Sequence, residues 1–303
     1  MLIDSWRPST QKQYKVYLSK WIEFCDSKKH FPLSRNIKMC LQFLLSLYKS
    51  NLSYSSINTA RSALSCIFDD PPIGDDVMIK RFMRSVFIKR PNVPRYEKIW
   101  DVSLVLNYLE KVSPCKSLNL QQLTFKLLML IALTTGQRCQ SLCALDLKHS
   151  QISNNSVIFK INTLLKHNRP NNCKNVVSLV SYPVNRRLCV ITYLKEYIKR
   201  TKSIRSDSKL FLSLHRPHKP VTASTLGRWI RLVLGKSGVN TKIFKAHSTR
   251  AAATSAAAKN LDTSIILKTA GWSNASTFAK YYNKPIITKK KSNTFGHAVL
   301  NTL

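Results

Sequence analysis

The sequence predicts a mainly α-helical fold with a small β-sheet, built as two domains. A chain of 303 residues that is 44% hydrophobic is long enough to bury two cores. Apolar residues recur at three- and four-residue intervals along most of the chain, which is the period of a helix with one buried face. Strand-like segments are confined to one short stretch near the middle of the chain.

The first 90 residues predict a small helical domain. Its first helix has one apolar stripe, formed by Tyr14, Tyr17, Leu18, Trp21, Ile22 and Cys25. Similar patterns over residues 37–48, 55–68 and 76–88 predict three more helices. Four short amphipathic helices can bury their stripes against one another, which indicates a compact bundle.

Residues 91–100 predict a linker between the two domains. The prolines Pro91 and Pro94 disfavour helix, and cations surround them. A basic linker is typical of a protein that holds a polyanion between two domains. A solvated hinge is the alternative.

Residues 101–303 predict a second domain that is mainly helical with a small sheet. Strands are expected at 157–161 and 175–180, and the turn that begins at Pro170 makes them a hairpin. Gly271 is placed to end the helix that precedes it. The helices are expected at 102–111, 118–134, 186–200, 224–235, 249–259 and 262–269.

Composition favours a nucleic-acid partner. Lys and Arg total 49 against 14 Asp and Glu, a formal charge of +35 that is spread along the whole chain. The sequence has no apolar run long enough to span a bilayer and no signal-peptide pattern, so we expect no membrane contact and an intracellular protein. Eight cysteines are scattered among apolar positions, which indicates structural thiols rather than a metal site.

Four short motifs carry the chemistry: Thr135-Gly-Gln-Arg138, His247-Ser-Thr-Arg250, Gly271-Trp272 and Tyr281-Tyr282. An arginine keeps its charge and presents a fork of donors that matches phosphate oxygens. A histidine titrates near neutral pH and can move a proton, and a tyrosine can attack phosphorus and hold a DNA end covalently. Together they are the groups needed to break a phosphodiester without a metal.

In this order the motifs resemble those of tyrosine recombinases of the phage-integrase family, and the resemblance covers nearly the whole chain. The amino-acid sequences of the motifs are most similar to those of recombinases from eukaryotic mobile elements of the DIRS and Crypton types. The resemblance implies a helical core-binding, DNA-binding domain over residues 1–90, a linker over 91–100 and an α+β catalytic domain over 101–303.

The resemblance also implies a role for each site residue. Arg138 and Arg250 are the phosphate-binding arginines, and His247 moves the proton of the nucleophile. Lys166, in the hairpin, is the general acid, although Lys160, Lys174 or His167 are alternatives in so basic a chain. Trp272 stands where many relatives have a second histidine, so it donates one hydrogen bond or is simply a core tryptophan.

The position of the nucleophile is open by one residue. Spacing from the Gly-Trp motif, as in phage and bacterial relatives, indicates Tyr281, whereas the pattern Phe278-x-x-aromatic-Tyr of eukaryotic elements indicates Tyr282. We favour Tyr282. Consecutive helical residues point about 100° apart, so only one of the two can face the phosphate.

The sequence therefore predicts a site-specific recombinase that needs no metal, ATP or other cofactor. Its expected partners are double-stranded DNA and, by resemblance, further copies of itself, four protomers on two DNA sites. A eukaryotic mobile element implies action in the nucleus. A catalytically silent DNA-binding protein derived from such an element is the alternative, and a nicking-closing topoisomerase is a third possibility.

Overall fold

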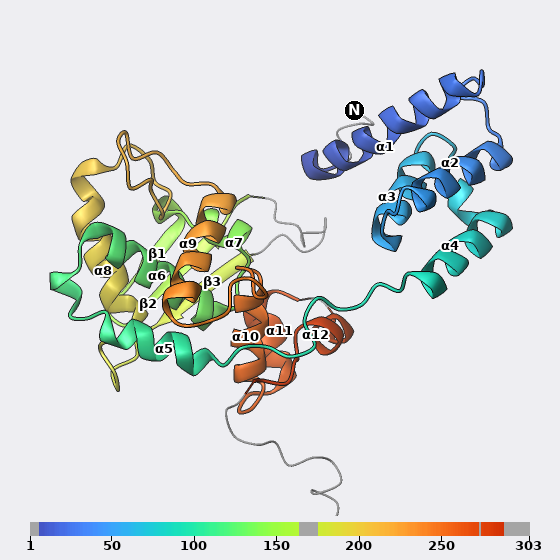
Figure 1. The fold of residues 1–303 in the computed structure, drawn as a ribbon. Coiled ribbons are helices and arrows are strands. Elements are labelled where there is room, and N and C mark those ends of the chain that lie inside the picture. Colours follow the sequence, from blue (N-terminus) through green and yellow to red (C-terminus); the bar gives the residue numbers. More distant parts are fainter. Residues whose placement is uncertain (1–5, 164–174, 273, 288–303) are drawn as a thin grey trace, which may run out of the picture. The chain divides into compact units, whose positions relative to one another are not determined.

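The computed structural model describes residues 6–163, 175–272 and 274–287. The chain divides into two compact units, an N-terminal unit of Met1–Arg95 and a C-terminal unit of Tyr96–Leu303. Helices dominate both units, and one small sheet lies in the second, so the predicted fold class is confirmed. Figure 1 shows the elements of each unit.

The N-terminal unit is a bundle whose core centres on Trp21. The indole ring lies edge-on to Phe43 at 5.4 Å between ring centroids, and its Nε1 donates to the Pro32 carbonyl at 2.9 Å. The third helix ends at Leu64, earlier than the pattern predicts, and a turn carries Phe68 back into the core. The helices are α1 (Pro8–Ser27), α2 (Ile37–Lys49), α3 (Tyr54–Leu64) and α4 (Val77–Lys89).

The C-terminal unit contains an antiparallel sheet in the order β1-β2-β3. The predicted hairpin is formed by β2 (Ser156–Ile161) and β3 (Asn175–Val180), with Phe159 opposite Val177 on the buried face. The edge strand β1 (Ser150–Ile152) was not predicted, because three largely polar residues give no alternating pattern. The helices are α5 (Val102–Lys111), α6 (Leu120–Thr135), α7 (Cys139–Cys143), α8 (Val190–Thr201), α9 (Ala223–Lys236), α10 (Ser248–Ala257), α11 (Thr263–Ala270) and α12 (Ala275–Tyr281).

Helix α6 runs through the core of this unit. It packs against α8, α9, α10 and β3, and the side chains from Leu123 to Ala132 are all buried. Asn119 closes its N-terminus with a capping box, and Gly136 ends it in the left-handed conformation with φ +59°. Helix α11 packs against α10, and α12 packs against α11 (Figure 1).

A lysine lies inside this core. Lys126 is 1% exposed, and its Nζ donates to the carbonyls of Leu109 and Val112 at 2.6 and 2.7 Å and to the Tyr193 hydroxyl at 2.7 Å. Burial lowers the pKa of Lys126 from 10.5 to about 8. The bonds to α5 and α8 offset part of the cost of burying the charge.

The pKa of Lys126 predicts a specific pH dependence of stability. At a pH between the pKa of Lys126 in the folded chain and its pKa in the unfolded chain, Lys126 is more protonated in the unfolded chain. The free energy of unfolding therefore rises with pH in this range. Relative to Lys126→Met, wild type should gain about 2 kcal/mol between about pH 7.5 and 9.5 in urea unfolding. The exposed Lys199→Met is the control and should track wild type at every pH. A gap between wild type and Lys126→Met that does not change with pH would contradict the assignment.

Candidate active site

The described site residues predicted from the sequence converge around the start of α10. Arg138 is the N-cap residue of α7, just after the Gly136 turn, and His247 is the N-cap residue of α10. Arg250 lies in the first turn of α10, and Trp272 follows Gly271, the left-handed residue that ends α11. Tyr282 is the C-cap residue that follows α12. The predicted Lys166 lies outside the described residues, as do the alternatives His167 and Lys174.

His247 and Tyr282 form a direct pair. The His247 Nε2 lies 2.9 Å from the Tyr282 hydroxyl, and the two rings meet edge-on with centroids 5.7 Å apart. This distance is short enough for a proton to pass between the two groups. Tyr281, in contrast, is 43% exposed, and its ring lies beside Lys280 rather than His247.

Arg250 links the two glycine turns. It is 2% exposed, and its Nη1 donates to the carbonyls of Gly136 and Ala270 at 2.6 and 2.7 Å. Its guanidinium also lies over the Trp272 ring, 3.7 Å from the centroid, and the Tyr282 ring lies 4.6 Å from that of Trp272. One buried side chain therefore fixes the segments that carry Arg138, Trp272 and the end of α12.

Buried donors without acceptors lie at and around the Arg250 guanidinium. Within the described part of the chain, Arg138 Nη1, Arg250 Nε and Nη2, and Trp272 Nε1 are buried and have no hydrogen-bond partner. Buried donors are costly unless an acceptor satisfies them. Burial, together with the nearby charge of Arg138, lowers the pKa of Arg250 to about 9. An anion bound at this cluster would supply acceptors and offset the repulsion between the arginines.

Trp272 lies against the Arg250 guanidinium. It is half-buried, its ring faces the Arg250 guanidinium, and its indole N–H belongs to the unsatisfied donor cluster. Lys160, an alternative general acid, is exposed on β2.

The structure adds a residue that sequence patterns did not indicate. Ser255 Oγ donates to the Tyr282 carbonyl at 2.7 Å and accepts from the Lys284 backbone N–H at 2.9 Å, so it holds the chain on both sides of Asn283. In the sequence it stands in a run of small residues that indicates only close helix packing. Its distance of 27 residues from Tyr282 leaves no local signal of this contact.

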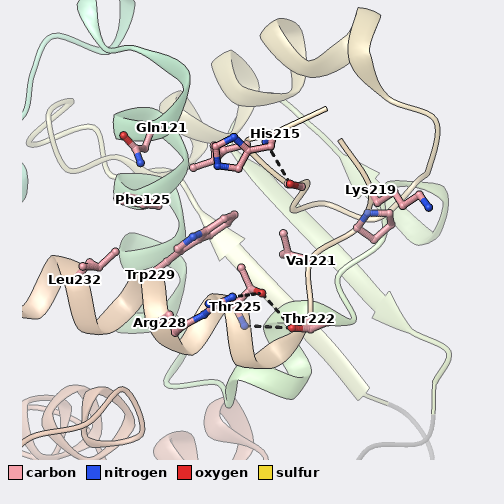
Figure 2. Close-up of a pocket in the computed structure, with 13 residues that line it drawn as sticks. Gln121, Phe125, His215, Lys219, Val221, Thr222, Thr225, Arg228, Trp229 and Leu232 are labelled. Carbon is pink, nitrogen blue, oxygen red and sulfur yellow. Dashed lines mark hydrogen bonds between the residues drawn. The ribbon is translucent and has the colours of Figure 1, made fainter. Parts of the chain in front are cut away.

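A separate pocket of about 570 Å³ opens between α6 and α9 (Figure 2). The Trp229 ring packs on Phe125 with centroids 5.5 Å apart, and His215, Lys219 and Arg228 add basic groups to the lining. Of the predicted site residues that the structure describes, none lines this pocket. The lining consists of Gln121, Phe125, Ser213, Leu214, His215, Lys219, Pro220, Val221, Thr222, Thr225, Arg228, Trp229 and Leu232.

The described residues contain neither a metal-ligand cluster nor a membrane-spanning helix. No group of three His, Cys, Asp or Glu side chains there is arranged to hold a metal ion. No helix in those ranges is both long and apolar enough to cross a bilayer.

The family follows from a comparison of the sequence with family models. The model described as the phage integrase family matches residues 103–286, more than half of the chain. The chain belongs to the phage integrase family. No curated protein matches this phage integrase family member.

Solved structures share the fold of this family member. A XerH site-specific recombinase in a post-cleavage complex with difH substrate is 16% identical, with a TM-score of 0.58 over 88% of this chain and 74% of that one. A lambda integrase dimer bound to a COC′ core site is 16% identical, with a TM-score of 0.56 over 95% and 76%. The Tn1549 transposon integrase in complex with transposon right-end DNA is 18% identical, with a TM-score of 0.57 over 89% and 85%.

Proposed function

We propose that this chain is a tyrosine-type site-specific DNA recombinase that cuts and rejoins DNA through a 3′-phosphotyrosine intermediate without metal or ATP. The observation that carries the proposal is the Tyr282 hydroxyl, 2.9 Å from His247 and beside a buried cluster of unsatisfied donors. A nucleophile, a proton acceptor and an anion site thus meet at one point, which is the constellation that phosphoryl transfer to a protein side chain requires.

In the proposed first step, Arg138 and Arg250 bind the non-bridging oxygens of the scissile phosphate. The Tyr282 oxygen attacks phosphorus while its proton passes to His247 Nε2. The bond between phosphorus and the 5′ oxygen breaks, and Lys166 protonates that oxygen. Trp272 donates its indole N–H to the phosphate and supports the Arg250 guanidinium. The arginines stabilise the charge that develops on the phosphoryl oxygens.

The second step reverses the first. A 5′-hydroxyl from another duplex gives its proton to Lys166 and attacks the phosphotyrosine, and the Tyr282 oxygen leaves and takes the proton held by His247. The covalent intermediate conserves the energy of the phosphodiester, so the cycle needs no nucleotide hydrolysis.

We propose double-stranded DNA as the partner, bound by both units, with the N-terminal unit as the core-binding domain. The net charge of +35 supports this, as do solved relatives described as bound to DNA, among them a lambda integrase tetramer on a Holliday junction. By the same analogy, four copies assemble on two sites. The amino-acid sequences of the motifs support an origin in a DIRS- or Crypton-type element and, with it, action in the nucleus.

Covalent trapping tests the proposed function. The protein is incubated with nicked suicide duplexes from the ends of its own genomic element in EDTA, then denatured and separated by gel electrophoresis. We expect a protein band shifted by covalently attached DNA. Salt-sensitive binding of the same duplexes without a shifted band would instead favour the silent DNA-binding protein.

A second assay separates the recombinase from a nicking-closing enzyme, which shares the phosphotyrosine chemistry. Supercoiled plasmid with and without an element end is incubated with the protein. We expect strand transfer that depends on the element end. Equal relaxation of both plasmids would favour the topoisomerase.

A further inference from the structure

The first residues of the C-terminal unit contact both chain segments that carry the His247–Tyr282 pair. We call residues 96–100, Tyr-Glu-Lys-Ile-Trp, the entry segment. It precedes α5 and has no residue in the donor cluster. It lies about 150 residues from His247 in sequence and about 185 from Tyr282, so its contacts are made by the fold alone.

On one side the entry segment holds the chain around His247. Trp100 Nε1 donates to Ser248 Oγ at 2.9 Å, and the two side chains are 2% and 0% exposed. The Tyr96 hydroxyl accepts from the Lys245 backbone N–H at 3.2 Å. Two hydrogen bonds therefore reach residues on either side of His247, one before it and one after it.

On the other side it holds the chain that follows Tyr282. The Ile99 N–H donates to the Pro285 carbonyl at 2.9 Å, and the Ile287 N–H donates to the Ile99 carbonyl at 2.7 Å. These bonds form a parallel bridge between Ile99 and Ile286, and Ile99 is fully buried. The entry segment thus restrains the chain beside both partners of the proton-transfer pair.

We propose that the entry segment is a positioning element for the His247–Tyr282 pair, with Trp100 as its main positioning residue. The proposal rests on the proposed function, because it gives the pair its catalytic meaning. Proton transfer needs heavy atoms within hydrogen-bond reach, and a displacement of about 1 Å can cost about a hundredfold in rate. The Trp100–Ser248 bond fixes the start of α10 next to His247, while the Ile99 bridge fixes the chain after Tyr282.

Single-turnover cleavage of a suicide duplex, compared with the dissociation constant for the same DNA, tests the proposal. Trp100→Phe keeps an aromatic ring but removes the N–H, and we expect cleavage to slow about tenfold or more with the dissociation constant unchanged. Ser248→Ala should slow it by a similar factor, and the double variant should be no slower than either single one. Trp229→Phe, the same change in the pocket of Figure 2, is the control and should cleave like wild type.

A readout without DNA separates this proposal from the proposed function. The side-chain NMR resonances of His247 and Tyr282 should shift in Trp100→Phe and stay in place in Trp229→Phe. If wild type never forms a covalent adduct, this shift still supports the positioning role while the recombinase proposal fails. Wild-type resonances in Trp100→Phe would overturn the inference, as would additive losses of rate in the double variant.

Discussion

Replacing Tyr282 with phenylalanine is expected to abolish covalent attachment to DNA, whereas Tyr281→Phe should leave attachment close to that of wild type. The Tyr282 hydroxyl is hydrogen-bonded to His247 at 2.9 Å. The centroid of the Tyr282 ring lies 5.5 Å from Cζ of the Arg250 guanidinium. Tyr281 is 43% exposed and contacts Lys280. Only Tyr282 combines a proton acceptor and an anion site, and phenylalanine keeps its ring but removes the attacking oxygen.

The two variants form a matched pair, because each removes one oxygen from one of two adjacent rings. The measurement is the fraction of a nicked suicide duplex that becomes bound to protein, with the dissociation constant of the DNA as control. We expect Tyr282→Phe to bind DNA like wild type and to form no adduct. An adduct that survives in Tyr282→Phe and disappears in Tyr281→Phe would assign the nucleophile to Tyr281.

Arg250→Lys is expected to slow cleavage by about a hundredfold to a thousandfold, the usual cost of losing one donor to a developing oxyanion. The guanidinium fork of Arg250 donates from Nη1 to the carbonyls of Gly136 and Ala270, and its buried Nε and Nη2 have no protein acceptor. A lysine ammonium is a point charge without this planar fork, so it cannot bond both carbonyls and also hold the phosphate in two places. The positive charge that Arg250→Lys retains should therefore not restore cleavage on its own.

A control is needed, because Arg250→Lys also weakens the link between the two glycine turns. Arg231→Lys changes an exposed arginine whose Nη2 donates to the Thr241 carbonyl at 3.3 Å, and it should cleave like wild type. Urea unfolding of each variant identifies loss of fold, and cleavage is compared only where the protein is folded. A folded Arg250→Lys protein that cleaves at the wild-type rate would contradict the proposed role of Arg250.

Most helix positions could be predicted from the apolar pattern, because helices such as α2 and α5 bury one apolar stripe of the sequence. The α5 prediction matches Val102–Lys111 at both ends, since Asp101 caps its N-terminus and the apolar pattern stops where the chain turns. Gly271 ends α11 as expected, because its φ of +71° is open to glycine at little cost. The strand positions also follow the pattern, and β2 places Val157 and Phe159 on the buried face of the sheet.

The parts that sequence did not predict depend on contacts between distant residues. Trp100 and Ser248 are 148 residues apart, and neither has a local pattern that indicates the other. The choice between Tyr281 and Tyr282 depends on where α12 ends, and a helix end is set by the packing around it as well as by local sequence. Ser255 likewise gains its role only when the chain after α12 folds back onto α10.

The most direct test of the phosphotyrosine mechanism is to identify the residue that carries DNA in the trapped complex. The adduct is digested with trypsin and nuclease, and the nucleotide-bearing peptide is sequenced by mass spectrometry. We predict a nucleotide joined through its 3′ phosphate to Tyr282. A nucleotide on any other residue, or a cleaved DNA strand that carries no peptide, would contradict the mechanism.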